Sequence, residues 1–351
     1  MTVSHISAAE VLAKLGNFSG VIDARSEGEY AEDHLPGAVN WPSLNDEERK
    51  VVGTHYKQIS AFEARKLGAA MVAKNIAGHI QQHVLDKPRE WQPLVYCWRG
   101  GKRSGSLALI LDQIGFNVTM VEGGYKAFRA ALVADLPQLA AQFSYRVVCG
   151  TTGSGKTRLL QALQAHGAQV LDLEDLANHR SSVLGMIPGL PQPSQKAFDR
   201  LVWARLRSFD AARPVYIESE SKKVGNVTIP EGLITAMRAS PCLQIELSED
   251  ERVVLLLQDY DFFVRDIALF CERLEALTQA RGKETVHDWQ ARARSGDVAS
   301  VVRELLVKHY DPVYLESMKR NFDLYSEAVV LRPADHSVDA MQALAQSLPI
   351  N

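Results

Sequence analysis

The chain has 351 residues, enough for two domains, and its 46% hydrophobic content is ordinary for a globular protein. The formal net charge is -3, and basic and acidic residues nearly balance within residues 1–140, 141–260 and 261–351, so any RNA would have to be met by a local patch. The four cysteines form no C-x-x-C pair, which argues against a zinc knuckle or a dithiol redox site and is typical of reduced thiols.

The N-terminal segment lacks the charged and apolar regions of a signal peptide. No apolar run approaches the roughly 18 residues that are needed to span a bilayer. We therefore expect a cytoplasmic protein with no membrane partner.

Residues 1–135 alternate helix and strand signals. Ser7 and Glu10 form a capping box that begins a helix. Short apolar strands are expected at residues 20–23, 93–97 and 118–121. Because helices separate these strands, the pattern predicts a parallel α/β sheet. Residues 43–92 are polar and helical, and they form a long insertion into this pattern.

Residues 136–144 are the expected linker, and a second alternation of strand and helix signals follows them. The expected strands lie at residues 145–149, 169–173, 214–219 and 242–247. Beyond about residue 248 the strand signals fade and amphipathic helices follow. We therefore predict a second α/β domain over residues 145–260, and a helical C-terminal region over residues 261–351 that packs with it.

A cysteine stands at the carboxyl end of one expected strand, which is where parallel sheets bind ligands. It opens a loop whose two glycines let backbone amides curl around an anion, and the next helix adds its positive N-terminal end. Cations in the loop add full charges, and all these features stabilise a thiolate or a persulfide. The predicted catalytic residue is Cys97, and the predicted anion loop comprises Trp98, Arg99, Gly100, Gly101, Lys102, Arg103 and Ser104. A buried structural cysteine is the alternative, although the loop composition favours an anion.

This loop resembles the active-site loop of the rhodanese family. Residues 21–42 support the resemblance, because they look like the family's upstream signature of an Asp-x-Arg pair, an acidic residue and then His-hydrophobic-Pro-Gly-Ala. The matching residues are Asp23, Arg25, Glu29, His34, Pro36, Gly37 and Ala38. The resemblance implies that this stretch is structural and that Cys97 carries a transferable chalcogen atom as a persulfide.

Residues 150–157 satisfy the pattern G-x-x-x-x-G-K-[ST] between an expected strand and an expected helix, which is the context of a P-loop. The glycines let backbone amides wrap a diphosphate, Lys156 reaches the terminal phosphoryl oxygens, and Thr157 can ligate Mg²⁺. The predicted diphosphate-binding residues are Gly150, Thr151, Thr152, Gly153, Ser154, Gly155, Lys156 and Thr157. The motif predicts which group binds but not which bond breaks.

Polar residues after the other strands are further candidates, because loops beyond strand carboxyl ends bind substrates in open sheets. Asp172 and Glu218 end expected strands, and each is a candidate to orient a metal ion or a water molecule. Pairing with a nearby Lys or Arg is the alternative for both. Arg180 and Lys222 are candidates to contact phosphates of RNA or of a diphosphate, with ordinary solvated charge as the alternative.

The whole chain resembles the tRNA 2-selenouridine synthase family. The resemblance is carried by Cys-Trp-Arg-Gly-Gly-x-Arg-Ser-Gly-Ser at residues 97–106, Leu-Asp-Leu-Glu at 171–174, Ala-Asn-His-Arg-Ser at 177–181 and Ile-Glu-Ser-Glu-Ser-Lys-Lys-Val-Gly at 217–225. It implies a rhodanese-like parallel-sheet domain followed by a P-loop NTPase-like α/β domain with a helical C-terminal extension.

The same resemblance implies a transferase that replaces sulfur by selenium in 2-thiouridine at the wobble position of tRNA. Selenophosphate is the implied selenium donor, geranyl diphosphate is the implied source of an S-geranyl intermediate, and Mg²⁺ is a candidate cofactor. Alkylation turns the thiouridine sulfur into a better leaving group, and a P-loop can stabilise the departing pyrophosphate without hydrolysing ATP.

Two other functions fit the same motifs. One is an ATP-dependent RNA sulfurtransferase that delivers persulfide sulfur from Cys97. The other is a nucleotide-sensing switch in which the P-loop gates a rhodanese-like binding module.

Overall fold

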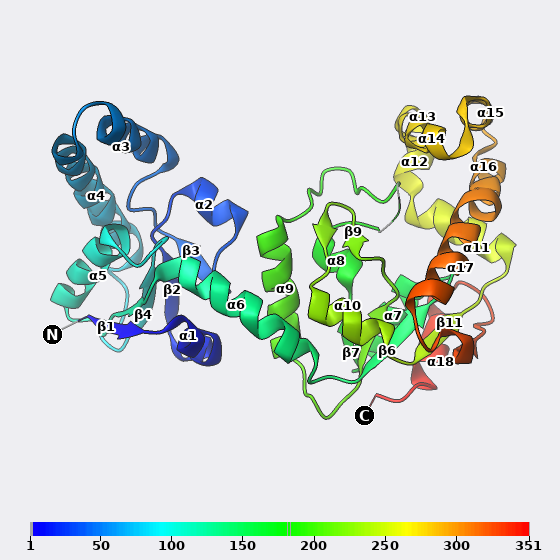
Figure 1. The fold of residues 1–351 in the computed structure, drawn as a ribbon, viewed down its shortest axis with the longest axis horizontal. Helices are drawn as coiled ribbons and strands as arrows, with labels where there is room; N and C mark the ends of the chain where they lie inside the picture. The colour runs from blue at the N-terminus through cyan, green and yellow to red at the C-terminus, as the bar shows by residue number, and fades with distance from the viewer. Residues whose placement is uncertain (1–2, 181, 183, 351) are drawn as a thin grey trace. The chain divides into compact units, whose positions relative to one another are not determined.

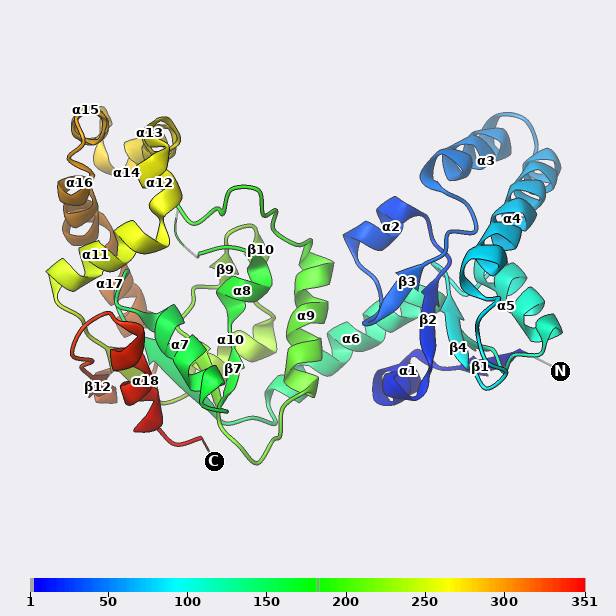
Figure 2. The same cartoon turned by 180° about the vertical axis from the view of Figure 1, so that it is seen from behind.

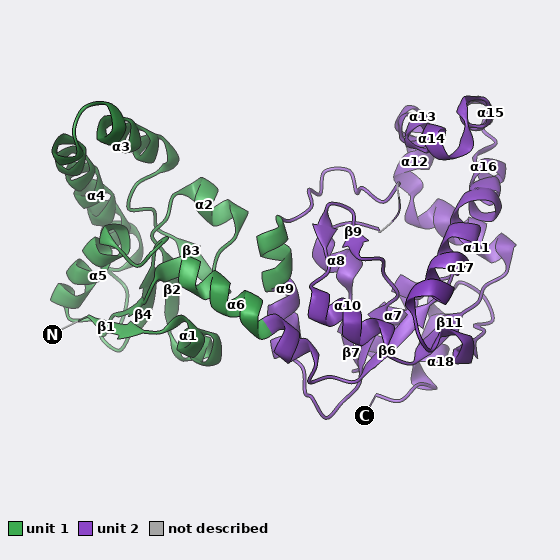
Figure 3. Ribbon diagram, viewed as in Figure 1, with its two compact units in different colours: residues 1–135, 194–200 green, residues 136–193, 201–351 purple. Residues whose placement is uncertain are grey.

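The computed structural model describes residues 3–350 apart from residues 181 and 183. The chain forms two compact units, the first of residues 1–135 with 194–200 and the second of residues 136–193 with 201–351 (Figure 3). Each unit is built on its own five-stranded sheet. The alternation of short apolar strands and helices predicted this α/β class, and the structure confirms it.

In the first unit, parallel strands lie in the order β1-β5-β4-β2-β3. Their bounds are β1 Ser4–Ile6, β2 Gly20–Asp23, β3 Ala38–Asn40, β4 Pro93–Tyr96 and β5 Thr119–Val121. All four residues of the central strand β4 are buried, which explains its continuous apolar sequence. Asp23 at the end of β2 lies opposite Tyr96 at the end of β4, so both strands end at the same sheet edge.

Helices cover both faces of this sheet. Their bounds are α1 Ala8–Lys14, α2 Glu27–Glu32, α3 Asp46–Gln58, α4 Ala61–His83, α5 Lys102–Ile114 and α6 Gly124–Ala140. Figures 1 and 2 show α4 and α5 on one face and α1 and α6 on the other. The predicted capping box of Ser7 and Glu10 begins α1. The core beside α5 includes Ile22, Val95 and Leu107.

The long insertion folds as a helical hairpin of α3 and α4. The two helices pack closely at Gly68, where an added Cβ would lie 3.4 Å from a methyl group of Val52. Residues 136–140, predicted as part of a linker, instead belong to α6, which contains Pro137.

In the second unit, parallel strands lie in the order β12-β11-β6-β8-β7, beside a small antiparallel pair. Their bounds are β6 Tyr145–Cys149, β7 Gln169–Leu171, β8 Val215–Glu218, β9 Lys223–Val224, β10 Val227–Thr228, β11 Cys242–Ile245 and β12 Val329–Leu331. The prediction that residues 261–351 are helical is wrong at β12, an edge strand that pairs with β11. Two of its three residues are exposed, so the sequence carried little of the apolar pattern of a buried strand.

The helices that belong wholly or in part to the second unit are α7 Lys156–Ala165, α8 Leu173–Ala177, α9 Gln195–Arg207, α10 Glu231–Arg238, α11 Glu249–Asp259, α12 Asp261–Arg265, α13 Ile267–Leu274, α14 Thr278–Arg281, α15 Lys283–Arg294, α16 Val298–Leu305, α17 Asp311–Asn321 and α18 Val338–Gln346. Residues 195–200 of α9 belong to the first unit. A five-residue π-helix over Leu306–Tyr310 joins α16 to α17. Helices α7 and α18 pack together against the sheet, whereas α11 to α16 form a separate helical cluster around the buried Trp289. Among the described helices, none is long and apolar enough to cross a membrane.

Candidate functional site

The first unit places Cys97 directly after β4, at the head of a tight loop. The side chain is buried, and its Sγ accepts hydrogen bonds from the amide of Gly101 at 3.3 Å and from the hydroxyl of Ser104 at 3.1 Å. Helix α5 begins at Lys102, so its positive N-terminal end faces the same loop. This arrangement of donors is suited to an anionic sulfur or to a chalcogen atom that it carries.

Glycines make the loop possible because other backbone atoms approach it closely. Gly100 has a φ of 67°, and an added Cβ would lie 2.8 Å from the carbonyl oxygen of Val121. Gly124 has a φ of 60°, and an added Cβ would lie 2.2 Å from the carbonyl oxygen of Cys97. A side chain at either position would displace the loop from the sheet.

The cations of the loop differ in whether a carboxylate neutralises their charge. Arg103 pairs with Glu29, its Nη1 lying 2.6 Å from Oε2 of that carboxylate. Burial opposes ionisation of Glu29, but the hydrogen bond and charge of Arg103 hold its pKa below the usual range. The charge of Arg103 is therefore largely neutralised, while Arg99 and Lys102 are exposed beside the loop.

The upstream signature residues form a buried scaffold. Asp23 and Arg25 make an ion pair of 2.6 Å with both side chains almost fully buried. Arg25 also donates to the backbone of Asp33, and its guanidinium lies 4.0 Å from the ring centre of Tyr125. His34 stacks on a tyrosine, and burial lowers its pKa, so it is a neutral scaffold side chain.

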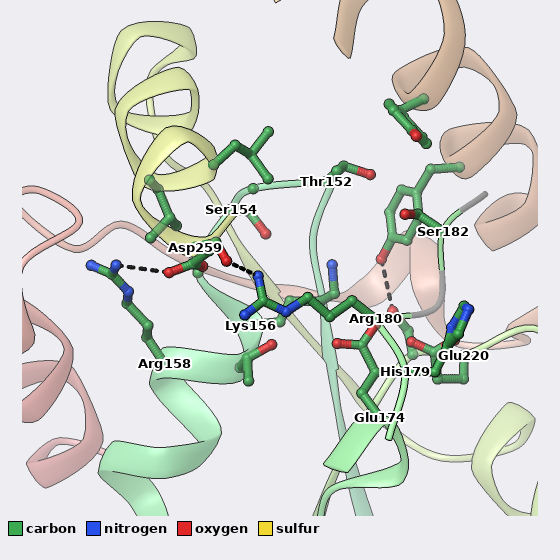
Figure 4. A pocket seen from close by; sticks show the side chains of 18 of the residues that line it. Thr152, Ser154, Lys156, Arg158, Glu174, His179, Arg180, Ser182, Glu220 and Asp259 are labelled. Atoms are coloured by element: carbon green, nitrogen blue, oxygen red, sulfur yellow. Dashed lines mark hydrogen bonds and ion pairs between the residues drawn. The ribbon is translucent and has the colours of Figure 1, made fainter. Parts of the chain in front are cut away.

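The second unit holds the P-loop between β6 and α7, as the sequence predicts. Gly150, Gly153 and Gly155 all have positive φ, the backbone conformation that lets the loop curl. Nζ of Lys156 donates to the carbonyl oxygen of Gly150 at 2.7 Å and lies 3.4 Å from that of Thr151. Figure 4 shows Lys156 beside the loop, with Glu174 facing the same space.

A tyrosine from the C-terminal helical region completes the loop. The hydroxyl of Tyr314 on α17 accepts a hydrogen bond from the amide of Gly150 at 2.7 Å and lies 2.8 Å from the hydroxyl of Ser219. The Tyr314 ring also lies 5.4 Å from Nζ of Lys156. No local sequence motif marks Tyr314, so the sequence did not predict its place at the loop.

A cavity of about 560 Å³ opens in front of the P-loop. Its lining includes residues from Thr152 to Thr157, as well as Asp172 and Arg180. The candidate Lys222 does not line the cavity; it is exposed and pairs with Glu231 at 3.0 Å. Arg180 stacks on the ring of Tyr260 and donates to the backbone of Asp259 (Figure 4).

Carboxylates gather beside the loop. Oxygen atoms of Glu174, Glu218 and Glu220 all lie within 4.8 Å of one another. Glu218 is fully buried; its Oε1 accepts from the amide of Glu174 at 2.9 Å, and its Oε2 has no hydrogen-bond partner among the described residues. Asp172 caps α8 by accepting from the amide of Asp175.

Burial and mutual repulsion raise the pKa values of this group. Burial first, and then the charge of Glu220, raise the pKa of Glu174 to about 8. Burial, and then Glu174, raise the pKa of Glu218 well above its usual range, and burial raises that of Asp172. With its pKa at about 8, Glu174 therefore holds a proton at neutral pH more readily than a free carboxyl group does.

A second, apolar cavity adjoins the first. Its volume is about 50 Å³, and it shares Thr152, Ser182, Leu256, Tyr260 and Tyr310 with the larger cavity. The remaining lining is entirely apolar: Leu184, Leu257, Phe263, Val264, Phe270, Val298, Val302, Leu305 and Leu306. The helical cluster of α11 to α16 thus supplies an apolar recess next to a diphosphate-binding loop.

These two sites define the class of the protein: a rhodanese-like domain and a P-loop domain in one chain. Comparison with known families agrees, because residues 7–131 match the rhodanese-like domain family. Residues 143–275 match the family described as the tRNA 2-selenouridine synthase AAA domain.

Full-length relatives extend this result. The tRNA 2-selenouridine synthase of Shewanella halifaxensis is 30% identical over 359 residues, which cover 92% of this chain and 95% of that protein. The chain therefore belongs to the tRNA 2-selenouridine synthase family. The synthases of Nitrosomonas europaea and Marinobacter nauticus are 36% and 37% identical over 68% of this chain, and these matches span 63% and 65% of the two relatives, just under two thirds of their length.

Proposed function

We propose that this chain replaces the sulfur of 2-thiouridine at the tRNA wobble position with selenium, through an S-geranyl intermediate. Geranyl diphosphate supplies the alkyl group and selenophosphate supplies the selenium. In the first step the thiocarbonyl sulfur bonds to C1 of the geranyl group, the C1–O bond to diphosphate breaks, and the N3 proton is lost. In the second step the selenium of selenophosphate adds at C2 and the geranyl thiol leaves with a proton, and water then cleaves the Se–P bond to release phosphate.

The observation that carries this proposal is the apolar cavity that adjoins the P-loop cavity. A prenyl diphosphate has a charged head and a hydrocarbon tail, and each methylene that is buried contributes about 0.8 kcal/mol. The P-loop cavity suits the head, and the recess lined by Phe263, Val302 and Leu305 suits a part of the tail. The polar ribose and base of a nucleotide would leave unsatisfied groups in such a recess.

The P-loop stabilises the leaving diphosphate. Backbone amides of such a loop can bind phosphoryl oxygens, and Lys156 supplies a full charge at the terminal phosphoryl oxygens, where negative charge grows as the C1–O bond breaks. The Lys156 amine donates to backbone carbonyl oxygens in the structure, so a diphosphate competes with those carbonyls for it. Tyr314 holds the Gly150 end of the loop in place.

A divalent cation fits the carboxylates beside the loop. Glu218 is buried with one oxygen lacking a partner among the described residues, and carboxylate oxygens are the ligands that Mg²⁺ prefers. We assign the binding of Mg²⁺ to Glu174, Glu218 and Glu220, together with the Thr157 hydroxyl that the P-loop pattern predicts. When bound, the ion neutralises charge on the diphosphate.

Cys97 serves the selenium step. The amide of Gly101, the hydroxyl of Ser104 and the exposed cations Arg99 and Lys102 favour an anion at this loop. The loop therefore binds selenophosphate beside Sγ. Geranyl transfer does not need this thiol, so the two steps use different residues.

The test is an incubation of the purified protein with 2-thiouridine tRNA, geranyl diphosphate and selenophosphate, followed by mass spectrometry of the nucleosides. We expect S-geranyl-2-thiouridine when selenophosphate is omitted, and 2-selenouridine when all three are present. Formation of 2-selenouridine in the absence of geranyl diphosphate, or RNA-stimulated ATP hydrolysis that drives the reaction, would contradict the proposal. The latter result would favour an ATP-dependent transferase.

A further inference from the structure

Helix α3 of the α3–α4 hairpin adds no buried residue to its unit, whereas α4 packs on the core through Ile76. All 13 residues of α3 are described, and none of them is buried. Helix α4 buries only Ala64, Gly68 and Ile76 among its described residues. A helix that buries nothing contributes little to a hydrophobic core, so α3 has to be explained by something outside the core.

The tip of the hairpin exposes large apolar side chains. Tyr56 is 61% exposed, Ile59 is 65% exposed and Phe62 is 61% exposed, and they lie within seven consecutive residues around the turn between the helices. Neighbouring exposed aromatic and aliphatic side chains of this size indicate a binding surface when charged residues surround them. We call Tyr56, Ile59 and Phe62 the hairpin tip.

The charge around the tip is strongly positive, although the whole chain has a net charge of -3. Residues 49–74 contain a single acidic residue, Glu63. They contain six basic residues, all exposed: Arg49, Lys50, Lys57, Arg65, Lys66 and Lys74. The acidic first turn of α3, with Asp46, Glu47 and Glu48, lies at the base of the hairpin, at the opposite end of α3 from the tip.

The cations are only partly engaged within the protein. Arg49 lies 3.4 Å from Glu29, and Lys66 lies 2.8 Å from Glu63. Lys50 and Lys57 are seven residues apart on α3, which places them on the same side of the helix. A row of cations on one side of a helix that leads to exposed aromatic rings fits a phosphate backbone with unstacked bases at its end.

We propose that the α3–α4 hairpin is an RNA-binding surface, on which the lysines contact tRNA phosphates and the hairpin tip stacks on unpaired bases of a loop. This inference takes from the proposed function only the identity of the partner, tRNA. It does not depend on geranyl transfer or on selenium transfer. An acidic protein partner is disfavoured by the aromatic rings, which match the faces of nucleobases. The hairpin provides the local basic patch that the balanced charge of the chain requires for any RNA contact.

The test measures the dissociation constant of full-length protein and a tRNA with 2-thiouridine at the wobble position, by fluorescence anisotropy at several salt concentrations. The charge variant Lys50→Ala/Lys57→Ala should weaken binding and reduce the salt slope by about 2, since each lost phosphate contact removes about 1. The tip variant Tyr56→Ala/Phe62→Ala should weaken binding about tenfold or more with an unchanged salt slope.

The matched control is Lys319→Ala/Arg320→Ala, which removes two exposed cations from the end of α17. Its affinity and salt slope should match those of the wild type. Because all the substituted side chains are exposed, circular dichroism and the reactivity of the Cys97 thiol should remain unchanged in every variant.

Three results would overturn the inference. Unchanged tRNA affinity in both hairpin variants would exclude the surface, and equal losses in the hairpin and control variants would show that only general charge matters. Unchanged tRNA binding together with a changed oligomeric state would mean that the tip contacts a second copy of this chain. If the wild-type protein does not bind the tRNA, the proposed function fails as well. Normal tRNA binding without selenation would refute only the proposed selenium transfer and would leave the hairpin proposal intact.

Discussion

Removal of the Lys156 amine should affect geranyl transfer at the P-loop and leave the selenium step at Cys97 in place. In the structure this amine bonds to the carbonyl oxygens of Gly150 and Thr151, so Lys156→Ala leaves the glycine-supported backbone of the loop in place. The variant lacks one charge at the terminal phosphoryl oxygens. The loss of one such stabilising contact costs on the order of 3 kcal/mol, or about a hundredfold in rate.

The same amine also acts on a neighbouring carboxyl group. The charge of Lys156 lowers the pKa of Glu174, opposing the burial and the repulsion that raise it. Without Lys156 this pKa should rise further, so the neutral form of Glu174 gains and the carboxyl does not replace the lost charge of the amine. We therefore expect geranyl transfer from geranyl diphosphate to fall by about a hundredfold or more.

The assay measures two half-reactions on the same protein by mass spectrometry of nucleosides. Geranyl transfer to 2-thiouridine tRNA should collapse in Lys156→Ala, whereas conversion of pre-made S-geranyl tRNA to 2-selenouridine tRNA should persist because no pyrophosphate leaves in that step. Lys222→Ala is the matched control, since Lys222 is exposed, pairs with Glu231 and does not line the cavity. Equal loss of both half-reactions would refute the separation and would mean that the P-loop also holds selenophosphate.

Cys97→Ser should abolish selenation and preserve geranyl transfer, as measured by the same two assays; normal selenation would make Cys97 a structural residue. Val302→Phe should fill part of the apolar recess and displace about two methylenes of the substrate. The KM for geranyl diphosphate should therefore rise about tenfold. The affinity for inorganic pyrophosphate, measured by calorimetry, should stay unchanged. The pKa of Glu174 rises on folding from 4.5 to about 8, so the folded state binds more protons between these values, and the free energy of unfolding should fall as pH rises from about 4.5 to 8. Glu174→Gln should flatten this dependence in chemical denaturation, and an unaltered pH profile would show that the carboxylate ionises normally.

The sequence predicted the two loops because each is a local pattern. The carbonyls, amides and glycines around Cys97 and Lys156 lie within a few residues of one another, and the strand-loop-helix context identifies them. Strand ends also indicated Glu218 and Asp172, since the carboxyl ends of parallel strands meet at one edge of a sheet.

The remaining features depend on contacts between distant segments. Tyr314 lies 164 residues from Gly150 in the sequence, and no motif connects them. Arg103 was expected to offer a free charge, but Glu29, 74 residues away, neutralises it. The apolar recess likewise arises from helices whose amphipathic patterns are ordinary one by one, so only their packing reveals a shared cavity.

The partnerless oxygen of Glu218 has a consequence for the order in which ligands bind. A bare diphosphate that enters the cavity finds no positive charge on a cluster of three carboxyl groups, whereas a cation bound to that cluster attracts it. Cation and diphosphate then bind with positive cooperativity, and by thermodynamic reciprocity each increases the affinity for the other. Release of pyrophosphate should accordingly weaken the binding of the cation.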